Sequence, residues 1–176
     1  MKTFRFLMMA LLTIVMLGCV GKDQGPIFPD NPNPPAPTPT PEPSEFPLIS
    51  TDPAFVTEAM TEDITVILNT AGTAADGFSG ELYAHTGVLT TDSSSSGDWK
   101  HVLSEWGENI PECKLEKKDD NIWHYVIKGG VHAWYSVPEN ETVTHIAFVF
   151  RSADSSIEVK DNGADIFVEL AQEGMS

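Results

Sequence analysis

The chain has little cysteine and carries none of the common catalytic signatures. Only two cysteines, Cys19 and Cys113, occur in 176 residues, so a framework of disulfides is excluded. The five histidines never recur at the i, i+4 spacing of a helical zinc site. There is no Gly-x-Ser-x-Gly elbow, no His-Glu-x-x-His sequence and no phosphate-binding loop. The sequence therefore predicts neither a bound metal, nor a cofactor, nor an independent enzyme.

Positive charge is also scarce. Ten Lys and Arg stand against 26 Asp and Glu, a formal net charge of −16; without Lys2 and Arg5, which lie in the leader described below, eight stand against 26, or −18. Such a balance disfavours nucleic acids and anionic lipid surfaces as partners. Carboxylate pairs that resemble those of a glycosidase, such as Glu105 with Glu108, are expected by chance at this abundance. We therefore expect no nucleic-acid partner and no catalysis by such a pair.

Long apolar segments are lacking except at the amino terminus. Lys2 and Arg5 precede an apolar run, 6–17, of about a dozen residues, which is shorter than the ~20 needed to cross a bilayer. The run ends in a Leu-Gly-Cys sequence, which is typical of lipoprotein signal peptides. We predict that the leader 1–18 is cleaved and that Cys19 is lipidated. An uncleaved anchor helix with an incidental cysteine is the alternative, and either interpretation predicts an exported protein.

Residues 19–45 are predicted to be a lipidated tether. Each buried methylene of an acyl chain contributes ~0.8 kcal/mol to membrane attachment, so acylation anchors a chain that has no spanning helix. A partial charged tag at 20–23 is similar to the one that sends some bacterial lipoproteins to the outer face of the outer membrane. Ten prolines fall within 26–47, and proline-rich chain extends ~3.1 Å per residue, a reach of up to ~70 Å. We expect an outer-membrane, cell-surface protein held on a stalk; a docking sequence for a proline-binding domain is the alternative.

Residues 46–172 are predicted to form one domain, with a short tail at 173–176. About 125 residues suffice for a single hydrophobic core without metal or disulfides. Five segments are rich in β-branched and aromatic residues or alternate between apolar and polar positions, namely 63–69, 82–88, 122–127, 142–151 and 165–170. Turn residues separate them. The pattern predicts an all-β, immunoglobulin-like sandwich of seven to eight antiparallel strands, with a short helix or irregular loop at 131–137.

Four strings in this domain carry a resemblance to a known family. They are Leu-Tyr-Ala-His-Thr-Gly-Val at 82–88, Trp-Lys-His-Val at 99–102 with Trp-Gly at 106–107, Phe-Val-Phe-Arg-Ser-Ala-Asp at 148–154, and Asp-Ile-Phe-Val at 165–168. In this order the chain resembles, over about 53–170, the immunoglobulin-like modules placed ahead of alpha-amylase-type catalytic domains in surface lipoproteins of gut bacteria. The resemblance implies a starch or α-glucan context and a non-catalytic module that either binds the polymer or packs beside the catalytic barrel. No barrel follows 170 in this sequence, so hydrolysis is not expected.

The residues themselves favour aromatic recognition of sugar. An indole packs against the C–H face of a sugar ring, and each large ring buries about 150–250 Å². Trp99, beside a serine-rich loop, and the pair Trp134-Tyr135, between a double glycine and a proline, are the predicted ligand-binding aromatics. Trp106 and Trp123 are predicted to be buried in the core instead.

Polar groups near these aromatics are the predicted partners of sugar hydroxyls. His101 and His132 are the candidates beside Trp99 and Trp134. His85 and Arg151 lie on the family strings near strand ends, where each is expected either to fix loop geometry or to contact sugar; Arg151 would fix a loop by pairing with Asp154 or Asp165.

Two hypotheses from different classes follow. The first is a surface lipoprotein that binds starch or a related α-glucan near glycan-uptake proteins, through loop aromatics and without catalysis. The second is a protein-interaction or spacer module, including the amino-terminal fragment of a larger amylase-like glycoside hydrolase.

Overall fold

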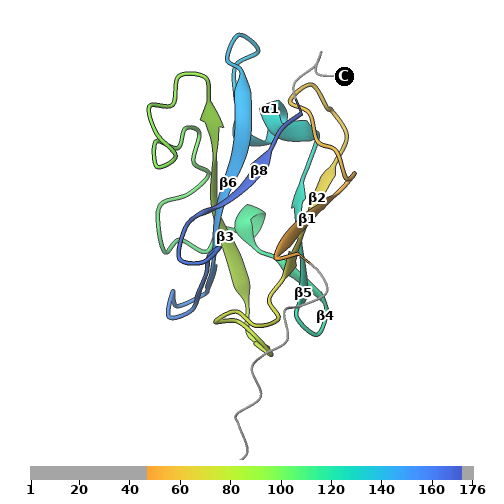
Figure 1. Ribbon diagram of the computed structural model, residues 1–176, viewed down its shortest axis with the longest axis vertical. Coiled ribbons are helices and arrows are strands. Elements are labelled where there is room, and N and C mark those ends of the chain that lie inside the picture. Colours follow the sequence, from red (N-terminus) through yellow and green to blue (C-terminus); the bar gives the residue numbers. More distant parts are fainter. Residues whose placement is uncertain (1–46, 172–176) are drawn as a thin grey trace, which may run out of the picture. The chain divides into compact units, whose positions relative to one another are not determined.

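The computed structural model describes residues 47–171, which fold into two antiparallel β-sheets packed face to face (Figure 1). In chain order the elements are β1 (Ile49–Asp52), β2 (Ile64–Asn69), β3 (Leu82–Thr90), the 3₁₀ turn η1 (Pro111–Cys113), β4 (Glu116–Asp119), β5 (Ile122–Ile127), α1 (Gly130–Tyr135), β6 (Val143–Ser152), β7 (Glu158–Val159) and β8 (Ile166–Glu169). One sheet has the order β1-β2-β5-β4, and in the other β6 pairs with β3 on one side and with β7 and β8 on the other. The predicted all-β sandwich is confirmed.

The core lies between the sheets and follows from the alternation of each strand. Successive side chains of a strand point to opposite faces, and β2 buries Ile64, Val66 and Leu68 completely. From the second sheet β6 buries Phe148 and Phe150, whose rings stack at 5.2 Å. Burying a side chain of this size stabilises a fold by about 1.5–3 kcal/mol. Without disulfides, these contacts hold the described domain together.

The long pair β3–β6 sets up the surface on which the candidate site lies. Its register runs from Leu82 opposite Ser152 to Thr90 opposite Val143. Because the side-chain period is two, the outer face of this pair carries one row of residues from each strand. Tyr83 lies opposite Arg151 and His85 opposite Val149 in those rows.

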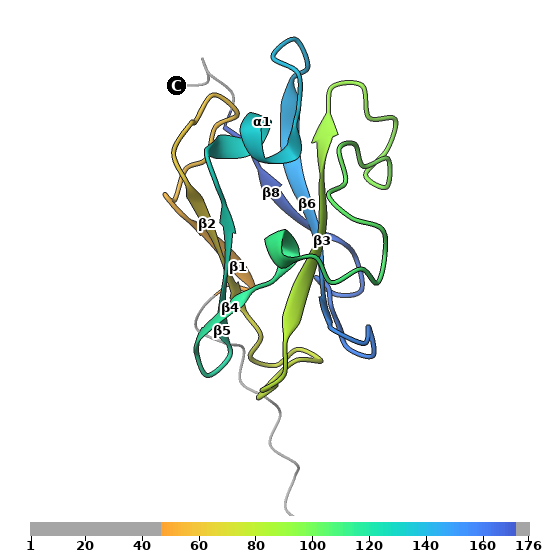
Figure 2. The ribbon, with the colours of Figure 1, turned by 180° about the vertical axis from the view of Figure 1, so that it is seen from behind.

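The connection from β3 to η1 runs along the edge of β3 that does not pair with β6. Val88 and Lys100 exchange backbone hydrogen bonds of 2.8 and 2.9 Å, so the connection runs beside β3 like a further strand. A Cβ added to Gly87 would lie 2.8 Å from the carbonyl oxygen of Lys100, closer than a side-chain carbon tolerates. Glycine at position 87 is therefore what lets the connection approach. The connection appears in green at the side of β3 in both views (Figures 1 and 2).

The structure confirms most of the predicted elements and corrects others. All five predicted strands are present, and the segment predicted as a short helix or loop forms α1, at one end of the sandwich (Figure 2). The short strands β1, β4 and β7 were not predicted. Trp123 is a core residue, 2% exposed, as expected. The expectation that Trp106 belongs to the core is wrong, because it is 46% exposed on the β3–η1 connection.

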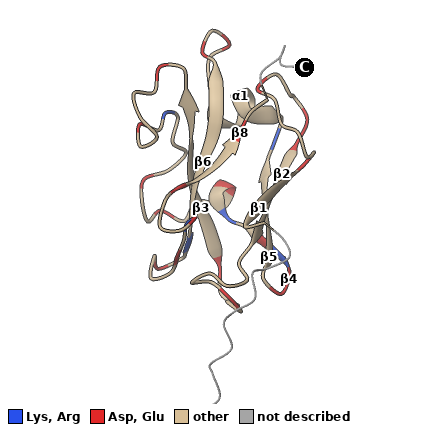
Figure 3. Ribbon diagram, viewed as in Figure 1, with Lys and Arg blue, Asp and Glu red and all other residues tan. Residues whose placement is uncertain are grey.

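The predicted leader, Cys19, most of the tether and the tail at 173–176 lie outside the described residues. Within 47–171 no helix is long and apolar enough to cross a membrane. Acidic side chains are spread over the loops at both ends of the domain, whereas the fewer basic side chains are scattered, two of the lysines lying in β4 (Figure 3).

Candidate functional site

The candidate site is built around His85, which projects from the outer face of β3 between two tryptophans of the β3–η1 connection. The Trp99 ring stacks on the imidazole with a centroid distance of 5.5 Å and an interplanar angle of 26°. The Trp106 ring meets the same imidazole edge-on at 5.2 Å and 80°. The two indole planes must therefore differ by at least 54°, the difference between those two angles. Three aromatic rings from one strand and one connection thus form an angled surface.

Trp99 is held in place by the serine-rich turn before it. Asp98 accepts hydrogen bonds from the backbone N–H and the hydroxyl of Ser94 and pairs with Lys100 at 2.8 Å. The bond to Lys100, followed by those to Ser94, lowers the pKa of Asp98 to about 2. The indole N–H of Trp99 donates to the carbonyl oxygen of Ser96 at 2.9 Å. The turn and its indole are therefore ordered without a ligand.

Trp106 is held by Arg151, which reaches up from the outer face of β6. The guanidinium carbon lies 5.9 Å from the Trp106 ring centroid and 5.7 Å from that of Tyr83. The guanidinium donates to the backbone carbonyl of Glu108 and, at 2.8 Å, to Oδ1 of Asn109. Arg151 is 1% exposed. Its cation is thus bonded to the segment that carries Trp106.

The expected pairing of Arg151 with Asp154 or Asp165 is wrong. Among the described residues no carboxylate lies within ion-pair distance of the guanidinium. Asp154 instead accepts hydrogen bonds from Ser152 and Ser156 within its own turn.

A hollow of about 420 Å³ opens beside the three rings, and we call it the tryptophan hollow. It is lined by His85, Trp99 and Trp106 together with Lys160 and Asp165 from the segment that leads from β7 to β8. Burial, and then the positive charge of Arg151, lower the pKa of His85 below its usual value of 6.5, against opposing effects of Glu105 and Asp165. The imidazole is therefore uncharged at neutral pH. The hollow offers apolar ring faces, one cation and one carboxylate.

The predicted polar partners lie elsewhere. His101 Nε2 is 2.9 Å from a carboxylate oxygen of Glu141, and His132 Nε2 is 3.4 Å from one of Glu58. His132, Glu58 and Glu141 line a separate hollow of about 560 Å³ beside α1. The structure therefore brings neither histidine into the tryptophan hollow.

The pair predicted at 134–135 is engaged with the core. The Trp134 ring is half-buried, and its N–H donates to the Tyr125 hydroxyl at 2.9 Å. Tyr135 is 2% exposed, and its hydroxyl lies 2.7 Å from the Thr86 hydroxyl in the interior. The prediction of Tyr135 as a sugar-binding ring is wrong, because α1 turns it into the sandwich. Trp99 alone of the predicted residues lies in the candidate site.

No protein-family model matches this chain, and no curated protein is significantly similar to it in sequence. Within 47–171 no group of three or more His, Cys, Asp and Glu side chains is arranged to hold a metal ion.

Sequence reasoning assigned three residues of the site to structural roles. Trp106 was assigned to the core, and for His85 a role in loop geometry was weighed against contact with sugar; both rings form the site with Trp99. The usable signal was position, because the two tryptophans flank a stretch with no apolar alternation and His85 lies in the predicted strand that precedes this stretch. Of its two expected roles Arg151 takes the structural one, through the Glu108 carbonyl and the Asn109 amide oxygen rather than a carboxylate.

Proposed function

We propose that this chain is an exported, lipid-anchored and non-catalytic protein that binds starch or a related α-glucan on the face formed by Trp99, His85 and Trp106. The observation that carries the proposal is the pair of tryptophans, held apart at an angle by one histidine and bordering a hollow. Because these two indoles lie on the outer face of a sheet, packing of the sandwich core does not explain their presence.

Each indole has one face already in contact with protein. His85 stacks on Trp99, and the guanidinium of Arg151 lies over Trp106. Trp99 is half-buried, while Trp106 keeps 46% of its surface exposed. Sugar rings pack on such surfaces through their C–H faces, and their hydroxyls require hydrogen-bonding neighbours. Lys160 and Asp165 supply a donor and an acceptor at the rim of the hollow.

The angle between the rings supports an α-linked polymer. A flat, ribbon-like β-1,4-glucan stacks its sugars on rings that share one plane, which indoles at least 54° apart cannot offer. An α-1,4-glucan curves along its length, so that successive sugars face different directions and can meet two inclined rings. The order of the site before binding also limits the entropy lost when a ligand is held.

Catalysis receives no support from the carboxylates near the site. Glu105 and Glu108 are both exposed, and Glu108 accepts a hydrogen bond from the backbone N–H of Glu105 at 3.0 Å. A glycosidase places its two carboxylic groups on either side of a bound sugar, which two residues of one exposed loop do not do.

The proposed location rests on the sequence and on the family that it resembles. Lipidation of Cys19 at the outer membrane, followed by the proline-rich tether, would hold the domain out from the cell surface. There the protein would hold polysaccharide near glycan-uptake proteins.

Protein binding is the second candidate function, and one residue favours it. Phe55, between β1 and β2, is 79% exposed, the highest value among the large apolar side chains described. An exposed aromatic of this kind is common at protein interfaces. A protein-interaction or spacer module would bind its partner through the surface around Phe55.

Affinity electrophoresis of the full chain in detergent, in gels with starch, glycogen, pullulan, dextran, hydroxyethyl cellulose or no polymer, tests the proposal. We expect retardation by starch, glycogen and pullulan alone, and its loss in folded Trp99→Ala and Trp106→Ala variants. Phe55→Ala is the matched control, because it removes an exposed aromatic outside the site. Equal mobility of the unmodified protein in all gels would reject glycan binding, and an effect of Phe55→Ala on a protein partner would favour the second function.

A further inference from the structure

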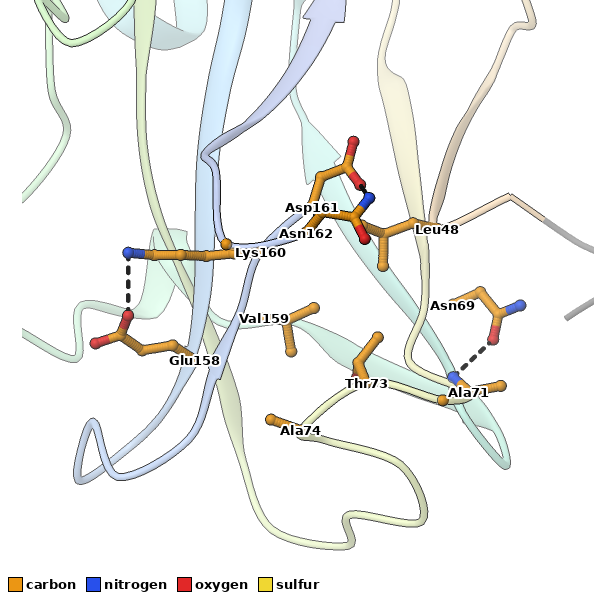
Figure 4. A pocket seen from close by; sticks show the side chains of 12 residues that line it. Leu48, Asn69, Ala71, Thr73, Ala74, Glu158, Val159, Lys160, Asp161 and Asn162 are labelled. Carbon is orange, nitrogen blue, oxygen red and sulfur yellow. Dashed lines mark hydrogen bonds and ion pairs between the residues drawn. The ribbon is translucent and has the colours of Figure 1, made fainter. Parts of the chain in front are cut away.

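A second hollow, of about 530 Å³, lies at the end of the sandwich opposite α1, and we call it the end hollow (Figure 4). The turn after β2, at 69–74, forms one side of it, and the segment 158–163 from β7 toward β8 forms the other. Leu48, just before β1, completes the lining. These walls come from both sheets, so the hollow opens where the two sheets part.

The lining of the end hollow suits a ligand rich in hydroxyl groups. No aromatic side chain takes part, and Ala71, Gly72, Ala74 and Gly163 keep the walls low. A Cβ placed on Gly72 or Gly163 would meet no atom within 4 Å, so the space above both glycines is open. Donors and acceptors are close by on one wall, where the Asn162 amide donates to the carboxylate of its neighbour Asp161 at 2.8 Å (Figure 4).

The two hollows share a wall. Lys160 lines the tryptophan hollow and the end hollow alike. In Figure 4 its side chain extends toward β6 and β3, while Asp161 and Asn162 lie on the other side of the same segment, toward Leu48. A single stretch of backbone therefore separates the two hollows. Lys160 lies on this stretch, and its ammonium group pairs with Glu158 at 3.2 Å.

We propose that the end hollow is a second subsite, which holds the continuation of the same α-glucan chain after it leaves Trp99 and Trp106 and passes Lys160. This inference rests on the proposed function, because the first subsite must bind glucan for the second to extend it. It adds that the protein binds long chains through two separate contacts, of which the first is aromatic and the second consists of hydrogen bonds alone.

Calorimetric titration of the full chain in detergent with a series from maltotriose to maltoheptaose tests the proposal. Ala74 is exposed on the wall of the end hollow, so Ala74→Leu should block the space and Ala74→Ser should leave it open. Asn162→Gly removes an amide from the rim at a φ of 50°, which glycine adopts without strain. We expect the dissociation constant to fall by about tenfold along the series in the unmodified protein and in Ala74→Ser.

In Ala74→Leu and Asn162→Gly we expect unchanged affinity for maltotriose and loss of most of the gain for maltoheptaose. Equal gains in all four proteins, or no gain in the unmodified one, would overturn the second subsite while leaving the proposed function intact. Failure of every oligosaccharide and of starch to bind would instead remove the proposed function and this inference with it.

Discussion

Arg151 offers the sharpest test of how the site is held. Its guanidinium donates to the carbonyl of Glu108 and to Oδ1 of Asn109, and it lies between the rings of Tyr83 and Trp106. Arg151→Met keeps a long apolar stem and removes every one of these hydrogen bonds. Because no carboxylate is left unpaired, the variant measures the loop contacts rather than an orphaned charge.

The expected magnitude follows from these contacts. Each hydrogen bond from a charged donor contributes about 1.5–3 kcal/mol, and a contact between the cation and an aromatic ring about 0.5–1 kcal/mol. The desolvation of a cation that is 1% exposed offsets part of this sum. We expect the free energy of unfolding to fall by about 2–4 kcal/mol, which a domain of ordinary stability survives. We also expect starch affinity to fall about tenfold, because Trp106 is no longer held against His85.

Urea unfolding followed by tryptophan fluorescence measures the stability, and titration with maltoheptaose measures the affinity. Arg151→Lys is the matched control: it keeps the charge without the planar fork and should lie between Arg151→Met and the unmodified protein in both assays. A loss of stability below about 0.5 kcal/mol in Arg151→Met would refute the reasoning about the loop contacts. Full affinity in a destabilised variant would refute the positioning of Trp106.

Three further predictions concern buried groups. Burial lowers the pKa of His85 below 6.5, so on acidification the unfolded chain takes up a proton before the folded chain does. The contribution of His85 to stability should be fully present above about pH 6.5 and fall as the pH drops below that value. In urea unfolding at a series of pH values, the free energy of unfolding should therefore change less steeply with pH in His85→Gln. Cys113 is fully buried, with its thiol pKa raised mainly by burial, so iodoacetamide should modify it only after unfolding, as mass spectrometry of its peptide would show; rapid labelling of the folded protein would contradict this. Tyr135→Phe should lower the stability in thermal unfolding by about 0.5–1.5 kcal/mol, because the Thr86 hydroxyl loses one of its two partners, at 2.7 Å, and keeps the Ala147 carbonyl at 2.8 Å. Starch affinity should not change, and weaker binding at full stability would restore Tyr135 to the site.

The fold was largely predictable because each main strand carries its own signal. Segments such as β2 and β6 combine β-branched residues with alternation, and that pattern survives whatever they pack against. The missed strands have no such signal. All residues of β4 are exposed and charged, and β7 has two residues, so their pairing depends on neighbours already being in place.

The site was less predictable because exposure is decided by tertiary contacts. Trp134 and Trp106 both lie between strands, and sequence alone assigned the first to ligand and the second to core. The structure shows the opposite arrangement. Helix α1 turns Trp134 against Tyr125, whereas Trp106 is held at the surface by Arg151, which lies 45 residues further along the chain. No local pattern records a contact over that separation.

The all-charged edge strand β4 has a consequence for crowding. A lipid anchor would confine copies of this protein to two dimensions, where neighbouring domains meet far more often than in solution. Sheet edges that meet repeatedly tend to join into continuous sheets, and charged side chains on an edge oppose this. With Glu116 and Asp119 at its ends and two lysines between them, β4 would bring like charges together if it paired along its full length with the β4 of another copy. Densely displayed copies should therefore stay separate, each with its tryptophan hollow free.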